Sequence, residues 1–263
     1  MSIHATAIID PAAEIDSDVT IGPYTIVEGG TRIAAGTRIG SCVRIYRGTT
    51  IGRDNRIDHG VVLGCDPQDM GFDTATETGL VIGDGNQLRE GVNISRGSVA
   101  GEATRLGNHN LFMAGTHAGH DCRIGDHNVL TQSAVMAGHV EVGSRVFIGG
   151  MSAIHQFVRL GDYAMLGGLS KITRDVPPYT TVDGNPSTIV GINVVGLRRN
   201  GFDGARRTLL KRACRHLFFS DSTLKSGVAA VEAEAELAGS ADVRRLLDFI
   251  ASSQRGLTGS GRD

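Results

Sequence analysis

The sequence predicts a left-handed parallel β-helix, an all-β prism, followed by a small α-helical C-terminal domain. Two observations support the prism. Aliphatic residues recur at every sixth position through most of the chain, and glycine or a small polar residue often follows them. A period of six fits neither an α-helix nor a two-faced strand. Three six-residue faces would close one triangular coil, which is the hexapeptide-repeat pattern.

Two aliphatic series define the extent of the prism. The first begins at Ile3 and reaches Leu63 without a break, and the second runs from Ile82 to Ile172 with Ala100 among its members. Because 40% of the residues are hydrophobic, chance alone would interrupt either series within a few steps. Coils stacked about 4.8 Å apart would place these side chains inside the prism.

Two interruptions of the repeat predict loops. The second series is shifted by one residue relative to the first, and the intervening residues 64–79 are rich in turn formers. We expect them to project from the prism, either as a functional loop or as a tolerated surface insertion. Residues 98–104 predict a second, smaller excursion.

The repeat ends near Asp175-Val-Pro-Pro178, because two prolines cannot donate ladder hydrogen bonds. We therefore assign residues 1–185 to the prism and residues 186–263 to a helical domain. Helical spacing there predicts three apolar stripes: Leu210, Ala213, Leu217 and Phe218; Leu224, Val228, Val231 and Ala235; and Val243, Leu246, Leu247 and Ile250. Asp203 and Ser240 are expected N-caps, Gly201, Gly204, Gly227 and Gly239 are expected helix breakers, and the tail from Ser252 is expected to be frayed.

Composition limits the function classes. The net charge of −2 gives no global attraction to nucleic acid or to a membrane surface, so a charged partner requires a local patch. The first sixteen residues lack a signal-peptide pattern, and no apolar run approaches the roughly 20 residues of a membrane span. The four scattered cysteines are typical of free thiols, so we expect a cytoplasmic protein. Because aromatic residues are few and the net charge is negative, we expect no nucleic-acid partner.

Histidines provide the candidate chemistry. His120, His139 and His155 are separated by close to one coil, so we expect a row of imidazoles on one edge of the prism, about 5 Å apart. His117 lies half a face away. The remaining histidines receive only a surface or structural interpretation: His4, His59, His109, His127 and His216.

Three interpretations of this row stay open. His120 can act as a general base if the carboxylate of Asp121 orients it, although adjacent strand residues point to opposite faces. Three histidines can also bind zinc, but the spacing of His117 and His120 is unlike that of known sites in this fold. The simplest alternative is a set of polar side chains that covers a subunit edge.

Several motifs go beyond the generic repeat: Ile51-Gly-Arg-Asp-Asn55, Pro67-Gln-Asp69, His117-Ala-Gly-His-Asp-Cys122, Ala137-Gly-His-Val140, Ile148 to Phe157, Asp175 to Tyr179, and Gly191 to Arg199. With them the chain resembles, over nearly its whole length, the UDP-N-acetylglucosamine O-acyltransferases that begin lipid A synthesis. The resemblance implies a homotrimer with active sites between prisms, a thioester donor on acyl carrier protein, a nucleotide-sugar acceptor, and no cofactor or metal.

The resemblance also implies roles for individual residues. His120 matches the general base and the N–H of Gly138 matches the oxyanion donor. Gly168 matches the position that limits acyl-chain length, where glycine predicts a long chain. The other matching positions imply contacts to sugar, nucleotide or acyl chain: Asp69, His117, His139, His155, Gln156, Asn193 and Arg199. We add Asp121 to the substrate-binding set because it neighbours His120.

Three residues depart from the family pattern: Gly71 replaces a usual lysine, Val195 a usual glutamate, and Pro186 a common histidine. They leave open an alternative in which a paralogue acylates another nucleotide sugar or an amino sugar, or uses acyl-CoA. A zinc hydratase or a scaffold protein is the third possibility. Residues 196–216 also carry seven cations against one acid, which predicts either a docking patch for acidic acyl carrier protein or an ordinary solvated helix face.

Overall fold

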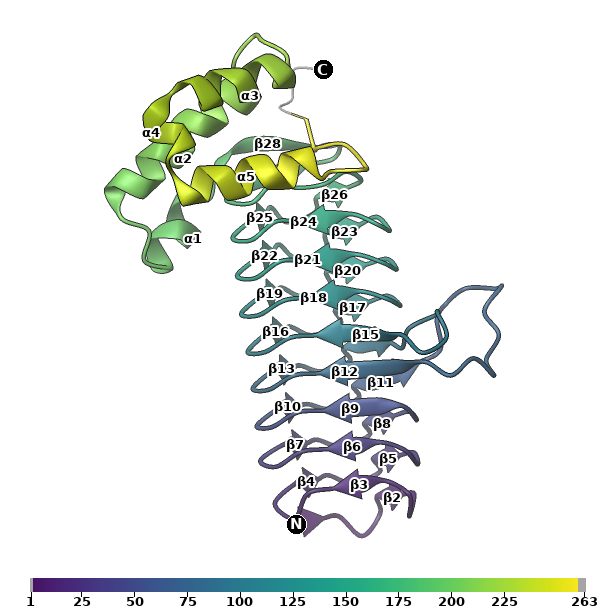
Figure 1. Cartoon of the computed structure of the whole chain (residues 1–263). Coiled ribbons are helices and arrows are strands. Elements are labelled where there is room, and N and C mark those ends of the chain that lie inside the picture. The colour runs from purple at the N-terminus through teal and green to yellow at the C-terminus, as the bar shows by residue number, and fades with distance from the viewer. Residues whose placement is uncertain (1, 260–263) are drawn as a thin grey trace.

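The computed structural model describes residues 2–259. It confirms the left-handed parallel β-helix, with a group of helices across its C-terminal end and one large loop projecting from its side (Figure 1). Among these residues, no helix combines the length and the apolar character that a membrane crossing requires.

Three sheets form the walls of the prism. Sheet A contains, in spatial order, β1 (Ser2–Ile3), β4 (Thr20–Ile21), β7 (Arg38–Ile39), β10 (Arg56–Ile57), β13 (Gln87–Leu88), β16 (Leu111–Phe112), β19 (Val129–Leu130), β22 (Phe147–Ile148), β25 (Met165–Leu166), β27 (Thr180–Gly184) and β28 (Ser187–Ile192). Sheet B contains β2 (Ile8–Ile9), β5 (Ile26–Val27), β8 (Arg44–Ile45), β11 (Val62–Cys65), β14 (Asn93–Ser95), β17 (His117–Ala118), β20 (Val135–Met136), β23 (Ala153–Ile154) and β26 (Lys171–Ile172). Sheet C contains β3 (Glu14–Ile15), β6 (Arg32–Ile33), β9 (Thr49–Ile51), β12 (Gly79–Ile82), β15 (Ala103–Leu106), β18 (Arg123–Ile124), β21 (Glu141–Val142) and β24 (Arg159–Leu160).

The two interruptions of the repeat lie where the sequence predicts them. Ile57 pairs with Leu88 on the next coil, which is further along the sequence than the regular 18 residues. The extra residues leave the wall between β11 and β12 as the projecting loop. Leu88 pairs with Phe112, because a shorter excursion separates β14 from β15. Ala100 lies exposed on this excursion, so its assignment to the aliphatic ladder was wrong.

The interior of the prism contains two kinds of ladder. The sixth-position aliphatic residues are buried from Ile21 onward, whereas Ile3 is 37% exposed at the open end of the prism. Small and polar residues fill the corners between them, and an asparagine ladder runs through four of these corners. In it, the Asn55 side-chain oxygen accepts from the N–H of Asn86, Asn86 accepts from Asn110, and Asn110 accepts from Asn128.

The prism continues past the two prolines. Val176 bridges to Leu160, and β27 pairs in parallel with β25 before the chain turns back as the antiparallel strand β28. The domain boundary expected between residues 185 and 186 therefore falls in the turn of a hairpin. The first helix begins later, at Val194.

Five helices follow: α1 (Val194–Arg199), α2 (Gly204–Phe218), α3 (Leu224–Ala233), α4 (Ala235–Ala238) and α5 (Ala241–Ala251). The expected N-caps are confirmed, because Asp203 accepts from the N–H of Arg206 and Ser240 from that of Val243. Gly227 lies inside α3 and does not break it. A β-carbon there would lie 2.5 Å from the carbonyl oxygen of His216, so glycine allows α3 to approach α2 closely.

The segment after α5 is ordered through Gly259, contrary to the expected fraying from Ser252. It returns along the last coil, where buried Asp175 accepts from the N–H of Thr258 and from the hydroxyl of Ser253. Main-chain hydrogen bonds outweigh the polar composition that suggested disorder. The remaining residues of the tail, 260–263, lie outside the described residues.

Candidate active site

The candidate site lies at the corner between sheets B and C, which we call the B–C corner. Two residues turn the chain there on each coil: His120 and Asp121, then Gly138 and His139, then Gln156 and Phe157. The second residue of each pair has a positive φ, 59° at Asp121 and at His139. The N–H of His139 donates to the carbonyl of His120 at 2.9 Å, and that of Phe157 donates to the carbonyl of Gly138, so these corners stack in register. The N–H of Asp121 donates instead to the hydroxyl of Thr104.

His120 and Asp121 form a hydrogen-bonded pair at this corner. Nδ1 of His120 lies 2.7 Å from Oδ2 of Asp121. The expectation that opposite strand faces would separate them does not apply, because both residues belong to a turn. A carboxylate can only accept, so the imidazole proton lies on Nδ1 and leaves the Nε2 lone pair available.

Asp121 is held by a residue that the sequence analysis did not single out. The N–H and hydroxyl of Ser98, on the short excursion, both donate to the carboxylate, the hydroxyl at 2.6 Å. Burial raises the pKa of Asp121, but the hydrogen bonds from Ser98 and His120 outweigh it and leave the pKa below its usual range. The group is therefore an ionised acceptor for the imidazole at neutral pH.

Gly138 lies directly above His120, one coil further along the prism. A β-carbon at this position would lie 2.6 Å from both Cε1 and Nε2 of His120, so only glycine lets the ring occupy its place. The N–H of Gly138 has no hydrogen-bond acceptor within residues 2–259. A free N–H beside a basic nitrogen can donate to an oxygen on which negative charge develops.

The row of three imidazoles is only partly present. The His139 ring meets the His120 ring edge-on, with centroids 5.1 Å apart, and its Nε2 lies 3.6 Å from Asp121. On its other side His139 stacks on Phe157, with centroids 4.5 Å apart. His155 lies at the end of a strand rather than in the turn, so its separation of 16 residues from His139 takes it out of the column. The coil period counted from His139 would have identified Phe157.

His155 and Gln156 lie exposed at the upper end of this corner. Nδ1 of His155 lies 3.4 Å from the guanidinium of Arg255, which also donates to the carbonyl of Thr173. The ordered C-terminal segment thus reaches a residue of the predicted site. This contact was not predicted, because the segment was expected to be frayed.

His117 is half-buried on the outer face of β17. Its Nδ1 lies 2.7 Å from Oδ1 of Asn93, whose amide nitrogen in turn lies 3.3 Å from the sulfur of Cys65. This arrangement makes Nδ1 the donor and leaves Nε2 as an acceptor. Burial lowers the pKa of His117, so the neutral ring is favoured at neutral pH.

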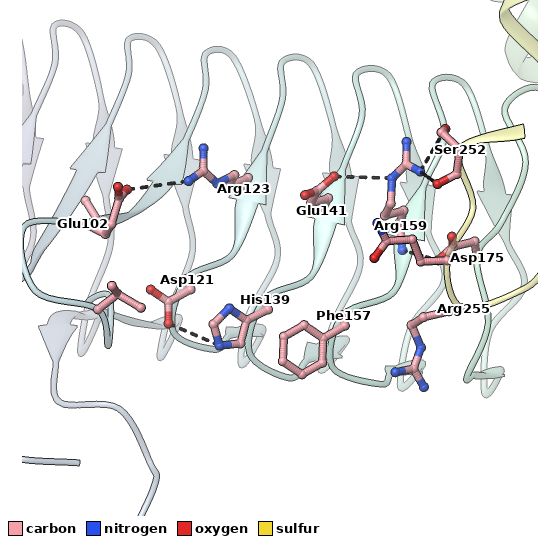
Figure 2. A pocket seen from close by; sticks show the side chains of 13 residues that line it. Glu102, Asp121, Arg123, His139, Glu141, Phe157, Arg159, Asp175, Ser252 and Arg255 are labelled. Atoms are coloured by element: carbon pink, nitrogen blue, oxygen red, sulfur yellow. Dashed lines mark hydrogen bonds and ion pairs between the residues drawn. The ribbon is translucent and has the colours of Figure 1, made fainter. Parts of the chain in front are cut away.

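A groove of about 610 Å³ runs along the same corner, over the outer face of sheet C (Figure 2). Asp121, His139, Phe157 and Arg255 follow one another along one side of it, and paired charges such as Arg159 and Glu141 line the other. His120 and Gly138 do not line this groove. They are the first residues of their corner pairs and follow the sheet B strands β17 and β20.

One group of side chains in the described part of the chain offers three ligand atoms to a metal ion: His120, Asp121 and His139, whose atoms lie within 4.8 Å of one another. It differs from the three-histidine site considered from the sequence, because His155 is not part of it. Two imidazoles and a carboxylate are a donor set that zinc accepts.

Comparisons with known proteins show the family of this chain. The family model of UDP-N-acetylglucosamine O-acyltransferase, domain 2, matches residues 175–258. Acyl-[acyl-carrier-protein]–UDP-N-acetylglucosamine O-acyltransferases are 48% identical in Cupriavidus necator, over 97% of this chain and 98% of that protein, and 43% identical in Myxococcus xanthus, with the same coverage. The chain belongs to the UDP-N-acetylglucosamine O-acyltransferase family. The crystal structure of the Moraxella catarrhalis enzyme, 40% identical, superposes with a TM-score of 0.93 over 98% of this chain and all of that one.

Three other family positions lie away from the B–C corner of this acyltransferase. Gly168 is at the corner between sheets A and B, the A–B corner, beside Gly150 of the preceding coil. Asn193 and Arg199 lie at the third corner, between sheets C and A, where with Arg145 they line a cavity of about 280 Å³. A single prism therefore does not bring the predicted residues together.

Asn193 and Asp69 have structural partners of their own. The Asn193 side chain caps α1 by accepting from the N–H of Gly196, and it donates to the carbonyl of Tyr163. Asp69, on the projecting loop, accepts from the N–H of Gly71 at 2.9 Å. Of the departures from the family pattern, Val195 lines the cavity beside Asn193, and Pro186 lies in the turn between β27 and β28.

Proposed function

We propose that this protein transfers a fatty acyl group from acyl carrier protein to the 3-hydroxyl of UDP-N-acetylglucosamine, the first step of lipid A synthesis, in the cytoplasm. The observation that carries the proposal is the arrangement at the B–C corner. An imidazole oriented by a half-buried carboxylate lies against a glycine with a free N–H. Acyl transfer from a thioester needs a base for the attacking hydroxyl and a donor for the oxyanion.

The reaction then follows from these groups. Nε2 of His120 takes the proton of the sugar hydroxyl while the oxygen attacks the thioester carbonyl carbon. The carbonyl oxygen becomes an oxyanion, to which the N–H of Gly138 donates, and Asp121 stabilises the imidazolium. The tetrahedral intermediate collapses with loss of the carrier thiolate, which receives the proton from His120. No cofactor or metal takes part in this sequence.

A homotrimer would complete the site. The outward residues of the upper coils of sheet A are apolar, with Phe147 38% exposed, and Met151 and Leu169 protrude at the A–B corner. The outward row of sheet C is charged instead. Three prisms with their A–B corners toward a common axis would bury the apolar surfaces, sheet A of one against sheet B of the next.

This arrangement explains why the family positions are dispersed. With sheet A of one subunit against sheet B of the next, the C–A corner of the first approaches the B–C corner of the second. Asn193 and Arg199 of one subunit would then face His120 and His117 of its neighbour. The guanidinium of Arg199 suits a diphosphate. Gly168 lies nearer the axis, where the cleft can receive the acyl chain.

The cationic patch for the carrier protein is smaller than its composition suggests. Arg206 forms an ion pair with Asp242, and Arg212 pairs with Glu234 and Glu236. Within residues 2–259, five cations of the patch have no ion pair: Arg198, Arg199, Arg207, Lys211 and Arg215. These are the residues that we expect to guide acidic carrier protein to the cleft.

The decisive experiment offers the purified protein a mixed pool of nucleotide sugars with acyl carrier proteins or acyl-CoA thioesters of several lengths. Mass spectrometry should find UDP-N-acetylglucosamine acylated at the 3-oxygen, from the carrier-protein thioester. His120→Ala should lower kcat by about 10²–10⁴-fold in a folded protein. Unchanged turnover of the variant would remove His120 from the mechanism.

The same experiment addresses the alternative acceptor. Gly71, Val195 and Pro186 alter acceptor recognition rather than the base, so an acylated amino sugar would keep the chemistry and change the substrate. Stoichiometric zinc in the purified protein, together with the three-ligand group at His120, would instead favour a metal-dependent hydratase.

A further inference from the structure

Arg96 joins the projecting loop to the wall of the prism. Its side chain is only 3% exposed although it carries a charge. Nε donates to the carboxylate of Asp66 at 2.8 Å, and Nη1 donates to the carbonyl of Thr76 at 2.7 Å and the hydroxyl of Thr78 at 3.0 Å. Nη2 donates to the carbonyl of Thr74 at 3.1 Å. One guanidinium thus binds both ends of the loop, where it leaves and where it returns to the wall.

The middle of the loop has fewer constraints. The ring of Phe72 lies under the guanidinium of Arg96, with 5.0 Å from Cζ to the ring centroid. Met70 is fully exposed, and Asp69 is held locally through its bond to the N–H of Gly71. The position of Asp69 relative to the prism therefore depends on the contacts that Arg96 makes at the base of the loop.

Two residues further along the chain, Ser98 makes the contacts that hold the carboxylate of Asp121. Gly97 between them bonds to the wall through its N–H, which donates to the carbonyl of Gly79. A β-carbon at Gly97 would lie 3.1 Å from Oδ1 of Asp121, so glycine lets the carboxylate approach this segment closely. The segment 96–98 therefore contacts the loop at one end and the partner of His120 at the other.

We propose that Arg96-Gly97-Ser98 is a positioning segment that sets the acceptor loop, and Asp69 on it, relative to the His120–Asp121 pair. This inference rests on the proposed function, in which the loop contacts the acceptor sugar. The two ends have separable tasks. Arg96 fixes where the acceptor binds, and Ser98 fixes the orientation of the base through Asp121.

The first test does not depend on activity. Arg96→Met removes the five donors and the charge while retaining the length of the aliphatic stem. Limited proteolysis with chymotrypsin, analysed by mass spectrometry, should show cleavage after Phe72 at least about tenfold faster than in the wild type. Arg47→Met is the matched control, because Arg47 is exposed and donates to the same Thr74 carbonyl through only one bond. It should change the rate far less.

The second test separates the two ends by kinetics. Arg96→Met should raise KM for the nucleotide-sugar acceptor about tenfold while KM for the acyl-carrier-protein donor stays unchanged. Arg96→Lys should not restore the acceptor KM, because one ammonium cannot span the contacts of the planar fork. Ser98→Ala should lower kcat about tenfold, shift the pH profile of kcat, and leave the acceptor KM unchanged.

A folded Arg96→Met variant with wild-type proteolysis and acceptor KM would overturn the proposal, as would equal increases in both KM values. If that variant does not fold, Asp66→Asn replaces it. Asp66 is half exposed, and its substitution weakens one contact of the Arg96 guanidinium. The contacts of Arg96 with Thr74, Thr76 and Thr78 would remain. Asp66→Asn should also raise the rate of proteolysis and the acceptor KM, but by smaller factors than Arg96→Met. Loss of the proposed function itself would appear differently, as an inactive wild-type protein with the proteolysis difference intact.

Discussion

The imidazole of His120 lies against the α-carbon of Gly138, and a β-carbon at that position would lie 2.6 Å from two atoms of the ring. Gly138 thus has two relationships to the base. Its lack of a side chain makes room for the ring, and in the proposed reaction its N–H donates to the oxyanion. Both depend on the coil period, which places residue 138 above residue 120.

We expect Gly138→Ala to displace His120 and lower kcat by about two orders of magnitude. The backbone at Gly138 does not require a positive φ, so alanine should fold there with little change in Tm. Steady-state kinetics and thermal unfolding of the same preparation measure the two effects. Gly204→Ala, where a β-carbon meets nothing within 4 Å, is the control and should keep full activity.

The repeat could be read from the sequence because each hexad places one aliphatic side chain inside the prism, and burial of that side chain outweighs any local preference. The pairing of His120 with Gly138 follows from the same count. The contact of Ser98 with Asp121 could not be predicted in this way, because Ser98 lies on the short excursion before β15, where the six-residue period is interrupted. The contact of Arg255 with His155 depends on long-range hydrogen bonds of the tail, which leave no periodic signal.

His117 should make stability depend on pH near neutrality. Burial lowers its pKa from 6.5, so the folded state binds this proton less readily than the unfolded state. The contribution is therefore fully present above pH 6.5 and is lost as pH falls from there through the pKa of the folded protein. We expect the thermal stability of the wild type, measured relative to His117→Gln, to fall between pH 7.5 and pH 5 (about the range in which an imidazole titrates).

Direct titration of the ring provides the control for this prediction. The Cε1 proton of His117 in NMR spectra should show a midpoint below 6.5. A midpoint at or above 6.5, or parallel pH profiles for the wild type and His117→Gln, would contradict the assignment of burial as the dominant cause. Neutral His117 also leaves Nε2 free to accept from a sugar hydroxyl, so the variant should raise the acceptor KM.

The trimer can be tested at the apolar wall. Phe147 points outward from sheet A, and Phe147→Glu would place a charge in the proposed contact with the next subunit. We expect light scattering to find monomers, and activity to disappear because His120 and Asn193 no longer face each other across the cleft. Arg123→Glu, on the charged outer wall of sheet C, should remain trimeric. A trimeric and active Phe147→Glu would exclude this wall as the contact.

Gly168 should set the longest acyl chain that the enzyme accepts. A β-carbon there would lie 3.4 Å from the carbonyl oxygen of Gly150, an ordinary contact, so larger side chains can be accommodated by the fold. They would instead fill space in the cleft beside the A–B corner. Gly168→Met should reduce turnover of the longest accepted chain by at least about tenfold, while shorter chains keep their kcat/KM. Competition between acyl carrier proteins of different chain length measures this shift directly, and equal losses at all lengths would show that Gly168 does not limit the chain.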